Sequence, residues 1–311
     1  MINEVTKHQF NFNDFDHFAE MIGEIALIEH SQLDCGVFCG KLDQIVCGPV
    51  IIHMHRMNRK ILQNGSGAPG FTSFLLTDFM KVDMHWRKKR LNGNVLGILR
   101  ANMEHSCVTP IDFSAISISI EDRFLQDIAS TLGHEYFFHT IRNKETLNID
   151  EKDALKIRHL VKAIKQCELP ASNIVANHIA ELIIKSVLSS ATNIHYKLAS
   201  NRGKVFQKAK EIIHSNYENP INVAILCKEI GTSERNLRYA FKEYSGLSPK
   251  KFMTHYKLNK VRKLLYTGKY EKVVEAANEV GFWHTGKFAA DYKILFGEFP
   301  SEMLKAKSPL G

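Results

Sequence analysis

A nine-residue pattern that occurs twice near the end of the chain constrains its fold more than any other feature. Residues 241–249 read FKEYSGLSP and residues 292–300 read YKILFGEFP. In both, an aromatic residue and a lysine are followed at fixed offsets by a glycine and a proline. Glycine commonly ends a helix and proline commonly starts one, so the pattern predicts the same helix boundary twice.

The residues upstream of the two copies also match. A short amphipathic helix is expected to end at Gly231 in the first copy and at Gly281 in the second, where a left-handed turn residue is needed. A second helix then follows, anchored inward in the first copy by Leu237 and Phe241. Small residues let such helices cross closely, which is the geometry of a helix-turn-helix. The sequence predicts helix-turn-helix units at about 221–246 and 272–297 and one stiff linker helix at about 249–266.

The charge of the chain is distributed unevenly. Residues 1–199 contain 21 Lys and Arg against 22 Asp and Glu, whereas residues 200–311 contain 20 against 11. The whole excess of +8 therefore comes from the C-terminal third. A basic segment of this kind favours binding to a polyanion, and the alternative is a basic surface that only maintains solubility.

The first 135 residues have the character of strands. FTSFLLT at 71–77 and VLGILRA at 95–101 are short apolar runs, and FSAISISI at 113–120 alternates with period two. The Asn-Gly pair in LNGN at 91–94 predicts a hairpin between its neighbours. Short strands separated by turn signals predict a small antiparallel barrel or sandwich.

Residues 150–190 are predicted to form a helical pair. Asp150 is a candidate cap for the first helix, Pro170 interrupts the pattern, and Ser172 is a candidate cap for the second. This pair either only covers the barrel or also presents an apolar seam to a second copy of the chain. The polar stretch 193–204 is predicted to be a linker, which divides the chain into domains at 1–199 and 200–311.

Residues 202–304 resemble the DNA-binding domain of AraC/XylS-type transcription regulators. The resemblance rests on LNKVRKLL at the linker helix and on EVGFWHTGKFAADYKILFGEFP at the C-terminal unit. It implies an α+β chain: a β-rich barrel or sandwich, a helical hairpin, and an all-α domain with two helix-turn-helix units. It also implies a transcription regulator that binds double-stranded DNA, with RNA polymerase and a small-molecule effector as further expected partners. We expect an activator, and the apolar helices at 150–190 predict a homodimer that forms through them.

The resemblance maps the first recognition helix onto TSERNLRYAFKEY. Arginine forks on such a helix suit the O6 and N7 atoms of guanine. The second unit has Ala290 where the family often has a basic residue. We therefore expect the first unit to determine the DNA sequence that is bound and the second mainly to position the protein on the DNA. The predicted DNA-binding residues are Ser233, Arg235, Asn236, Arg238, Tyr239 and Lys242 in the first unit and His284, Thr285, Lys287 and Lys293 in the second.

Two other motifs favour simpler interpretations. GSGAPG at 65–70 matches a dinucleotide fingerprint, but Pro69 lies inside it and a strand follows, so a flexible loop is expected. His53 and His55 would share one face of a strand, which is typical of ordinary strand histidines or of a metal site. A metal- or thiol-sensing regulator that uses Cys35, Cys39, Cys47, His53 and His55 is therefore the alternative function, together with a constitutive DNA-binding protein that has no effector.

The composition restricts the class of protein further. The chain contains 44% hydrophobic and 24% charged residues, which is typical of globular proteins. No apolar run approaches membrane-spanning length and the first residues lack the features of a secretory signal, so a cytoplasmic protein without membrane contact is predicted. No catalytic arrangement is visible in the linear sequence, so neither an enzyme activity nor a cofactor is predicted.

Overall fold

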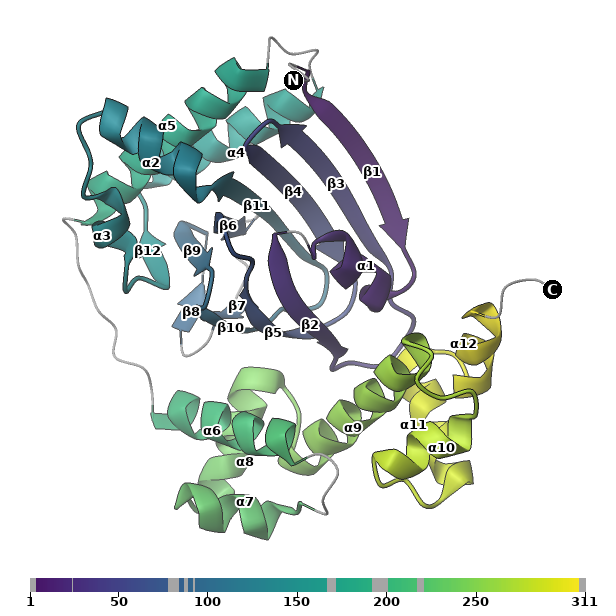
Figure 1. The fold of residues 1–311 in the computed structure, drawn as a ribbon. Helices are drawn as coiled ribbons and strands as arrows, with labels where there is room; N and C mark the ends of the chain where they lie inside the picture. The colour runs from purple at the N-terminus through teal and green to yellow at the C-terminus, as the bar shows by residue number, and fades with distance from the viewer. Residues whose placement is uncertain are drawn as a thin grey trace.

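A computed structural model of the chain describes residues 4–307, except for 24, 78–83, 87–88, 92, 167–171, 192–200 and 217–220. Figure 1 shows a β-rich N-terminal part, helices that cover one side of it, and a row of C-terminal helices beneath it. The fold class predicted from the sequence, α+β with a C-terminal all-α part, is confirmed.

Two antiparallel sheets form the β-rich part. The larger has the order β1-β3-β4-β11-β6-β9-β12 and the smaller β2-β5-β10-β7-β8. The strands of the larger sheet are β1 (Thr6–Phe12), β3 (Gly40–Cys47), β4 (Val50–Met57), β6 (Phe71–Thr77), β9 (Val95–Arg100), β11 (Phe113–Glu121) and β12 (Thr146–Asn148). Those of the smaller are β2 (Ala26–Gln32), β5 (Ile61–Gly67), β7 (Met84–Trp86), β8 (Lys89–Leu91) and β10 (Glu104–Val108).

The predicted strands at 71–77, 95–101 and 113–120 correspond to β6, β9 and β11. The hairpin predicted around residues 91–94 is wrong, because β8 pairs with β7 while β9 pairs with β6 and β12. An Asn-Gly pair favours a local turn, but burial of the sheet faces decides which strands become partners. β8 and β9 therefore belong to different sheets.

The expected loop at 65–70 is also partly wrong, because Gly65 and Gly67 belong to β5. A Cβ atom at Gly65 would lie 1.9 Å from the carbonyl oxygen of Leu27 on the neighbouring strand β2. The glycine therefore serves close approach of two backbones in a sheet, and the dinucleotide fingerprint has no helix N-terminus after it.

The helices of the N-terminal part lie mostly on the outer face of the larger sheet (Figure 1). They are α1 (Phe15–Met21), α2 (Asp122–Thr131), α3 (Phe137–Ile141), α4 (Glu151–Gln166) and α5 (Ser172–Ala191). The predicted helical pair at 150–190 is thus α4 and α5, and the Asp150 carboxylate caps α4 by accepting from the Lys152 N–H at 2.8 Å. Ile157, Val161 and Ile183 are buried against the sheet, so most of the apolar surface of the pair is used in this core.

Seven helices make up the described C-terminal part: α6 (Asn201–Ser215), α7 (Val223–Ile230), α8 (Glu234–Ser245), α9 (Pro249–Tyr266), α10 (Val273–Glu279), α11 (Thr285–Phe296) and α12 (Pro300–Lys307). The linker predicted at 193–204 is wrong in its last four residues, which form the first turn of α6. A glycine in a helix costs about 1 kcal/mol, and burial of Val205 and Phe206 offsets this cost at Gly203.

The C-terminal helices share their cores with the two sheets, which together are called the barrel below. Leu33 and Leu62 of the N-terminal part are buried together with Leu237 and Phe241 of α8. Phe15 of α1 similarly packs against Phe296 of α11, with ring centroids 6.3 Å apart. Both ends of the C-terminal part are therefore docked onto the N-terminal part.

Candidate nucleic-acid interface

The first helix-turn-helix unit consists of α7 and α8. The Asn222 side chain caps α7 by accepting from the Ile225 N–H at 3.0 Å, and Gly231 ends it in the left-handed conformation (φ 71°). Ser233 then caps α8 by accepting from the Asn236 N–H at 3.3 Å. A side chain at the N-terminus of each helix thus satisfies one of its backbone N–H groups.

The second unit, α10 and α11, repeats this plan with fewer caps. Gly281 has φ 84° in the turn, and Gly297 ends α11 at φ 83°. His284 occupies the N-cap position of α11 without a side-chain hydrogen bond to the helix. Phe288 and Tyr292 are buried, so the side of α11 that they occupy faces the core.

The linker helix α9 sets the separation of the two units. It begins at Pro249 after a Ser248 cap, and its 18 residues make it about 27 Å long at 1.5 Å per residue. Successive major grooves on one face of B-DNA are about 34 Å apart. Two recognition helices at the ends of α9 are therefore on the correct length scale for neighbouring grooves.

The exposed side of α8 carries an interacting group of cations and one aromatic ring. The Arg235 guanidinium lies over the Tyr239 ring, 5.6 Å from its centroid, and Arg202 of α6 lies over the same ring at 5.2 Å. Arg238 forms an ion pair with Glu234 one turn earlier, and both side chains are more than half exposed. Such exposed pairs contribute little stability, so Arg238 can exchange Glu234 for a base or phosphate at low cost.

Two predicted residues of this unit, Asn236 and Lys242, have further local contacts. The Asn236 amide donates to the Thr232 hydroxyl at 2.9 Å and is half-buried, so it stabilises the turn in the free protein. Lys242 lies at the far end of α8 and donates to the Gly246 carbonyl at 3.4 Å. Their DNA contacts stay predictions. Ser233, Arg235, Arg238 and Tyr239 all lie on the exposed N-terminal half of the helix.

On α11, His284, Thr285 and Lys287 are exposed in its first turn. Lys293 lies at the other end of the helix, with its ammonium 3.9 Å from the centroid of the Phe299 ring. The structure therefore separates Lys293 from the other three predicted residues of this unit.

Two exposed side chains beside the predicted set were missed in the sequence. Arg202 was assigned to a linker, although the basic run NRGK before an apolar helix was a usable signal. Trp283, in the turn before α11, is 74% exposed, and an indole in a helix-helix turn is an unusual choice for a structural role.

The N-terminal part holds both recognition helices at their C-terminal ends. The Lys60 ammonium donates to the carbonyl of Ser245, the last residue of α8, at 3.3 Å. The Gly36 N–H donates to the carbonyl of Leu295 near the end of α11 at 2.9 Å. Docking therefore leaves the N-terminal halves of α8 and α11, which carry the arginines and Lys287, on the surface.

The cysteines and histidines of the alternative function are not brought together. His53 and His55 line the inside of the barrel, whereas Cys47 is buried on the outer face of the same sheet, in the core under α4 and α5. Cys35 and Cys39 are exposed in the segment before β3. Among the described residues, no group of three His, Cys, Asp or Glu side chains is arranged to hold a metal ion.

The barrel histidines are neutral. Burial lowers the pKa of His30 and of His53 to about 3 and that of His55 to about 4, and the nearby His55 adds to the lowering at the other two. His30 and His53 are each within 2.9 Å of a glutamine side chain, Gln63 and Gln44 respectively. These imidazoles therefore act as polar core residues.

Comparison with known proteins agrees with this geometry. Residues 226–306 match the family described as "Helix-turn-helix domain". The chain is 29% identical over 136 residues to the XylDLEGF operon transcriptional activator 1 of Pseudomonas putida, which spans 43% of this chain and 41% of that protein. It is 26% identical over 209 residues to the probable thc operon regulatory protein of Rhodococcus erythropolis, which spans 63% of each chain.

Solved structures of similar proteins include AraC-type regulators. The AraC-like transcriptional activator CuxR is 13% identical, with a TM-score of 0.44, over 81% of this chain and 94% of CuxR. A probable AraC family transcriptional regulator from Rhodopseudomonas palustris is 34% identical, with a TM-score of 0.32, over 34% of this chain and 99% of that chain.

The two linked units define a helix-turn-helix DNA-binding domain at the C-terminus. The matched helix-turn-helix domain and the operon regulators to which the chain is similar agree with the AraC/XylS-type resemblance of this region. The match covers less than half the length of the P. putida activator, so it describes the domain and not the whole of that protein. No helix among the described residues is long and apolar enough to cross a membrane.

Proposed function

We propose that this chain is a sequence-specific DNA-binding transcription regulator, with residues 200–311 as its DNA-binding domain and residues 1–199 as its effector and dimerisation domain. The observation that carries the proposal is the pair of recognition helices, α8 and α11, at the two ends of α9. Each presents exposed basic side chains on its N-terminal half, which is the half that a recognition helix inserts into the major groove.

Within this proposal the two units have different roles. Arg235 and Arg238 of α8 read base edges, because guanidinium groups bind guanine in a bidentate manner. In α11, Lys287 is followed by Ala290, which has no hydrogen-bonding group, so this helix mainly binds phosphates and fixes the register. One subunit then reads an asymmetric site about two half-turns long.

An effector response is supported by the docking of both units on the N-terminal part. Any ligand that changes the β2–β3 region or β5 acts on segments that contact α8, α9 and α11 directly. The P. putida relative is named an activator, and we propose activation through contact with RNA polymerase for this chain as well. Its place of action is then the cytoplasm, where DNA and polymerase are accessible.

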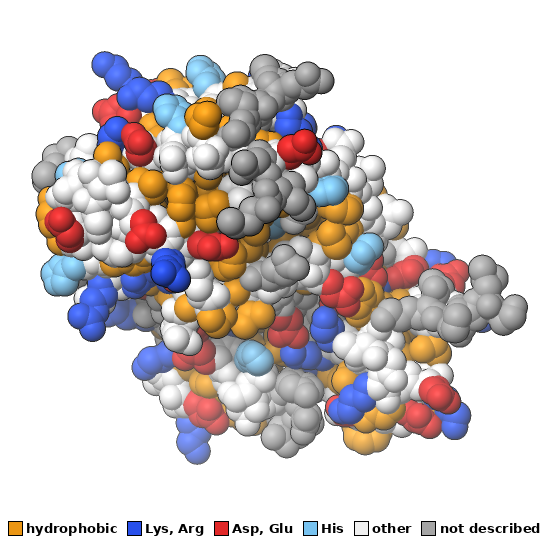
Figure 2. All heavy atoms as spheres, turned by 45° about the horizontal axis from the view of Figure 1, so that its top comes forward, with side chains coloured by type: hydrophobic (Ala, Val, Ile, Leu, Met, Phe, Trp, Pro, Cys, Tyr) orange, Lys and Arg blue, Asp and Glu red, His pale blue; other side chains and the backbone are white. Residues whose placement is uncertain are grey.

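Dimerisation through α4 and α5 completes the proposal. Ile174 is 58% exposed and Leu155 is 39% exposed on this pair, although most of its apolar residues are buried in the core. In Figure 2, which turns this end of the molecule forward, hydrophobic side chains are visible between charged ones. A second subunit that covers them would bring two DNA-binding domains together.

The test is selection of binding sites from random DNA with the full-length protein. We expect one enriched asymmetric motif, and we expect the Arg235→Ala/Arg238→Ala double variant to lose the enrichment while it still binds DNA at low salt. Equal retention of all sequences by the unchanged protein would contradict the proposal and would favour a constitutive DNA-organising protein.

A further inference from the structure

The outer face of the larger sheet is divided into two zones. Ile45, Val50 and Ile52 form an apolar zone, which α4 and α5 cover. Continuing along the same face, the side chains that alternate outward become polar or charged, namely Lys41, Asp43, Arg56 and Ser114. Within the same strands, the outward-facing side chains therefore change from apolar to polar or charged before the strands end.

A groove of about 420 Å³ lies between this second zone and α4. We call it the α4 groove. Its size is within the range of small-molecule pockets. It is lined by Lys41, Asp43, Met54, Arg56, Ser114, Ala115, Ile116, Arg158, His159, Val161, Lys162, Lys165 and Gln166.

The walls of the α4 groove are strongly basic. Five Lys or Arg side chains line it against a single carboxylate, Asp43. That carboxylate is already bound, since Lys165 donates to it at 2.5 Å and Gln9 donates to its other oxygen at 2.6 Å. Burial alone would raise the pKa of Asp43, but these hydrogen bonds outweigh it and the pKa is lowered. Because residues 1–199 as a whole are nearly balanced in charge, this gathering of cations is local.

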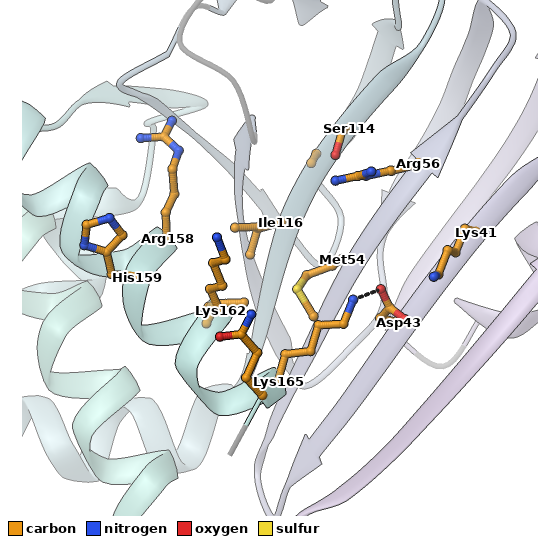
Figure 3. A pocket seen from close by; sticks show the side chains of 13 residues that line it. Lys41, Asp43, Met54, Arg56, Ser114, Ile116, Arg158, His159, Lys162 and Lys165 are labelled. Carbon is orange, nitrogen blue, oxygen red and sulfur yellow. Dashed lines mark hydrogen bonds and ion pairs between the residues drawn. The ribbon is translucent and has the colours of Figure 1, made fainter.

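The register places like charges opposite each other. Lys41 on β3 is the direct neighbour of Arg56 on β4, and both are on the groove side of the sheet. Two neighbouring cations on one wall of the groove favour the approach of an anionic group. Figure 3 shows both side chains extending from the sheet, with Lys162 on α4 across from them and Lys165 reaching over to Asp43.

The floor of the α4 groove is apolar. Met54 and Ile116 are direct neighbours on β4 and β11, one row along from the charged pair, and Val161 of α4 faces them. A ligand that fits both features has an acidic group for the lysines and an apolar body for this floor.

The cavity inside the barrel is much smaller than the α4 groove. It lies between Phe18, Trp86 and the histidines and measures about 50 Å³, which is room for a water molecule or two. Burial lowers the pKa of His53 and His55 on its wall, so these two imidazoles are neutral and do not supply charge to hold an anion.

We propose that the α4 groove binds a small organic anion, with Lys41 and Lys162 contacting its acidic group and Met54 and Ile116 its apolar body. If the protein is the effector-responsive regulator proposed above, this site on the outside of the barrel receives the effector. The binding itself does not depend on that function.

The experiment is calorimetric titration of the full-length protein, without DNA, with 2-naphthoate, 2-naphthyl phosphate and 2-naphthamide. These probes share an apolar body and differ in the charge of the head group. Both anions are expected to bind at least about tenfold more tightly than the neutral amide, because the amide has no negative charge to balance the positive charge of the lysines. The tighter anion identifies the head group as a carboxylate or a phosphate.

Matched variants locate the site. The Lys41→Gln/Lys162→Gln double variant is expected to weaken anion binding about tenfold or more, whereas Lys152→Gln, on the first turn of the same helix and outside the groove, leaves it unchanged. Melting curves of all variants confirm that they are folded. The proposal is overturned if the amide binds as well as the anions, if the double variant binds the anions normally, or if no anion binds at about 5 mM. DNA binding is measured separately, so failure of the groove and failure of the DNA-binding function give different results.

Discussion

Asn259 of α9 forms two hydrogen bonds with the backbone of Gln32, the last residue of β2. Its side-chain oxygen accepts from the Gln32 N–H at 2.7 Å, and its amide nitrogen donates to the Gln32 carbonyl at 2.8 Å. β2 is an edge strand of the smaller sheet, so the asparagine satisfies backbone groups that a neighbouring strand would otherwise bind. The linker helix between the two helix-turn-helix units is therefore attached to the edge of the smaller sheet.

This attachment is testable with Asn259→Ala. The change leaves a buried N–H and a buried carbonyl without their partner, and we expect a loss of about 1–3 kcal/mol in the free energy of unfolding. Urea unfolding followed by tryptophan fluorescence measures it, since Trp86 is in the barrel and Trp283 is beside α11. Thr254→Ala is the control, because that hydroxyl donates to Lys250 within the same helix. Equal losses in both variants would contradict the proposed attachment.

The isolated fragment 200–311 is predicted to fold and to bind DNA weakly. Arg262 of α9 is 4% exposed and binds Asp14 at 2.8 Å and Glu298 at 2.5 Å. In the fragment it loses Asp14 but keeps Glu298, so a partner for the buried guanidinium remains. Circular dichroism and fluorescence anisotropy at low salt measure folding and binding. A folded fragment without any DNA affinity would refute the assignment of the DNA-binding domain.

The two recognition helices are predicted to respond differently to alanine substitution. Arg235→Ala or Arg238→Ala should cost about 1–3 kcal/mol on the specific site if the arginine binds a base in a bidentate manner, and far less on random DNA. Lys287→Ala should weaken binding to both kinds of DNA. It should also reduce, by about one unit, the slope of the logarithm of the binding constant against the logarithm of the salt concentration, as expected for a phosphate contact. Binding titrations at several salt concentrations measure both effects.

Melting curves separate these effects from packing. Arg235 lies over Tyr239, so its loss could instead lower stability, whereas Arg238 contacts only an exposed carboxylate among the interactions described for it. If both arginine variants bind specific DNA normally while Lys287→Ala abolishes discrimination, the roles of the two helices are reversed.

The barrel is predicted to lose stability in acid. The pKa of His30 and His53 is about 3 and that of His55 about 4 in the folded protein, against about 6.5 in the unfolded chain. The unfolded chain therefore binds more protons below pH 6.5, and stability that is present above this pH is lost as the pH falls toward 3–4. The loss is on the order of 2 kcal/mol per histidine at pH 5. Asp16, whose pKa burial raises to about 6, acts in the opposite direction, but as a single group.

Thermal melting of the full-length protein at about pH 7.5 and pH 5 measures this effect. In His53→Gln, which keeps a polar group beside Gln44, the difference between the two pH values should be smaller. His139→Gln, at an exposed position of α3, should behave as the unchanged protein. An equal pH difference in all three proteins would contradict the assignment to buried histidines.

The helix-turn-helix units were predictable from the sequence because their determinants are local. Gly231, Gly246, Gly281 and Gly297 are the turn and end residues, and each has φ between 71° and 84°. A glycine, a cap and an inward-facing aromatic residue act over one or two helical turns, so their spacing in the sequence is also their spacing in space. The strands β6 and β9 were found through short apolar runs and β11 through its alternation, and these signals are also local.

Contacts between distant residues could be decided only by the tertiary structure. Asn259 and Gln32 are 227 residues apart, and neither residue type indicates the other. The pairing of β8 with β7, the filling of the barrel by its histidines and the basic walls of the α4 groove depend equally on which faces meet. Burial of apolar area is not directional, so the sequence pattern states which face is buried but not which surface covers it.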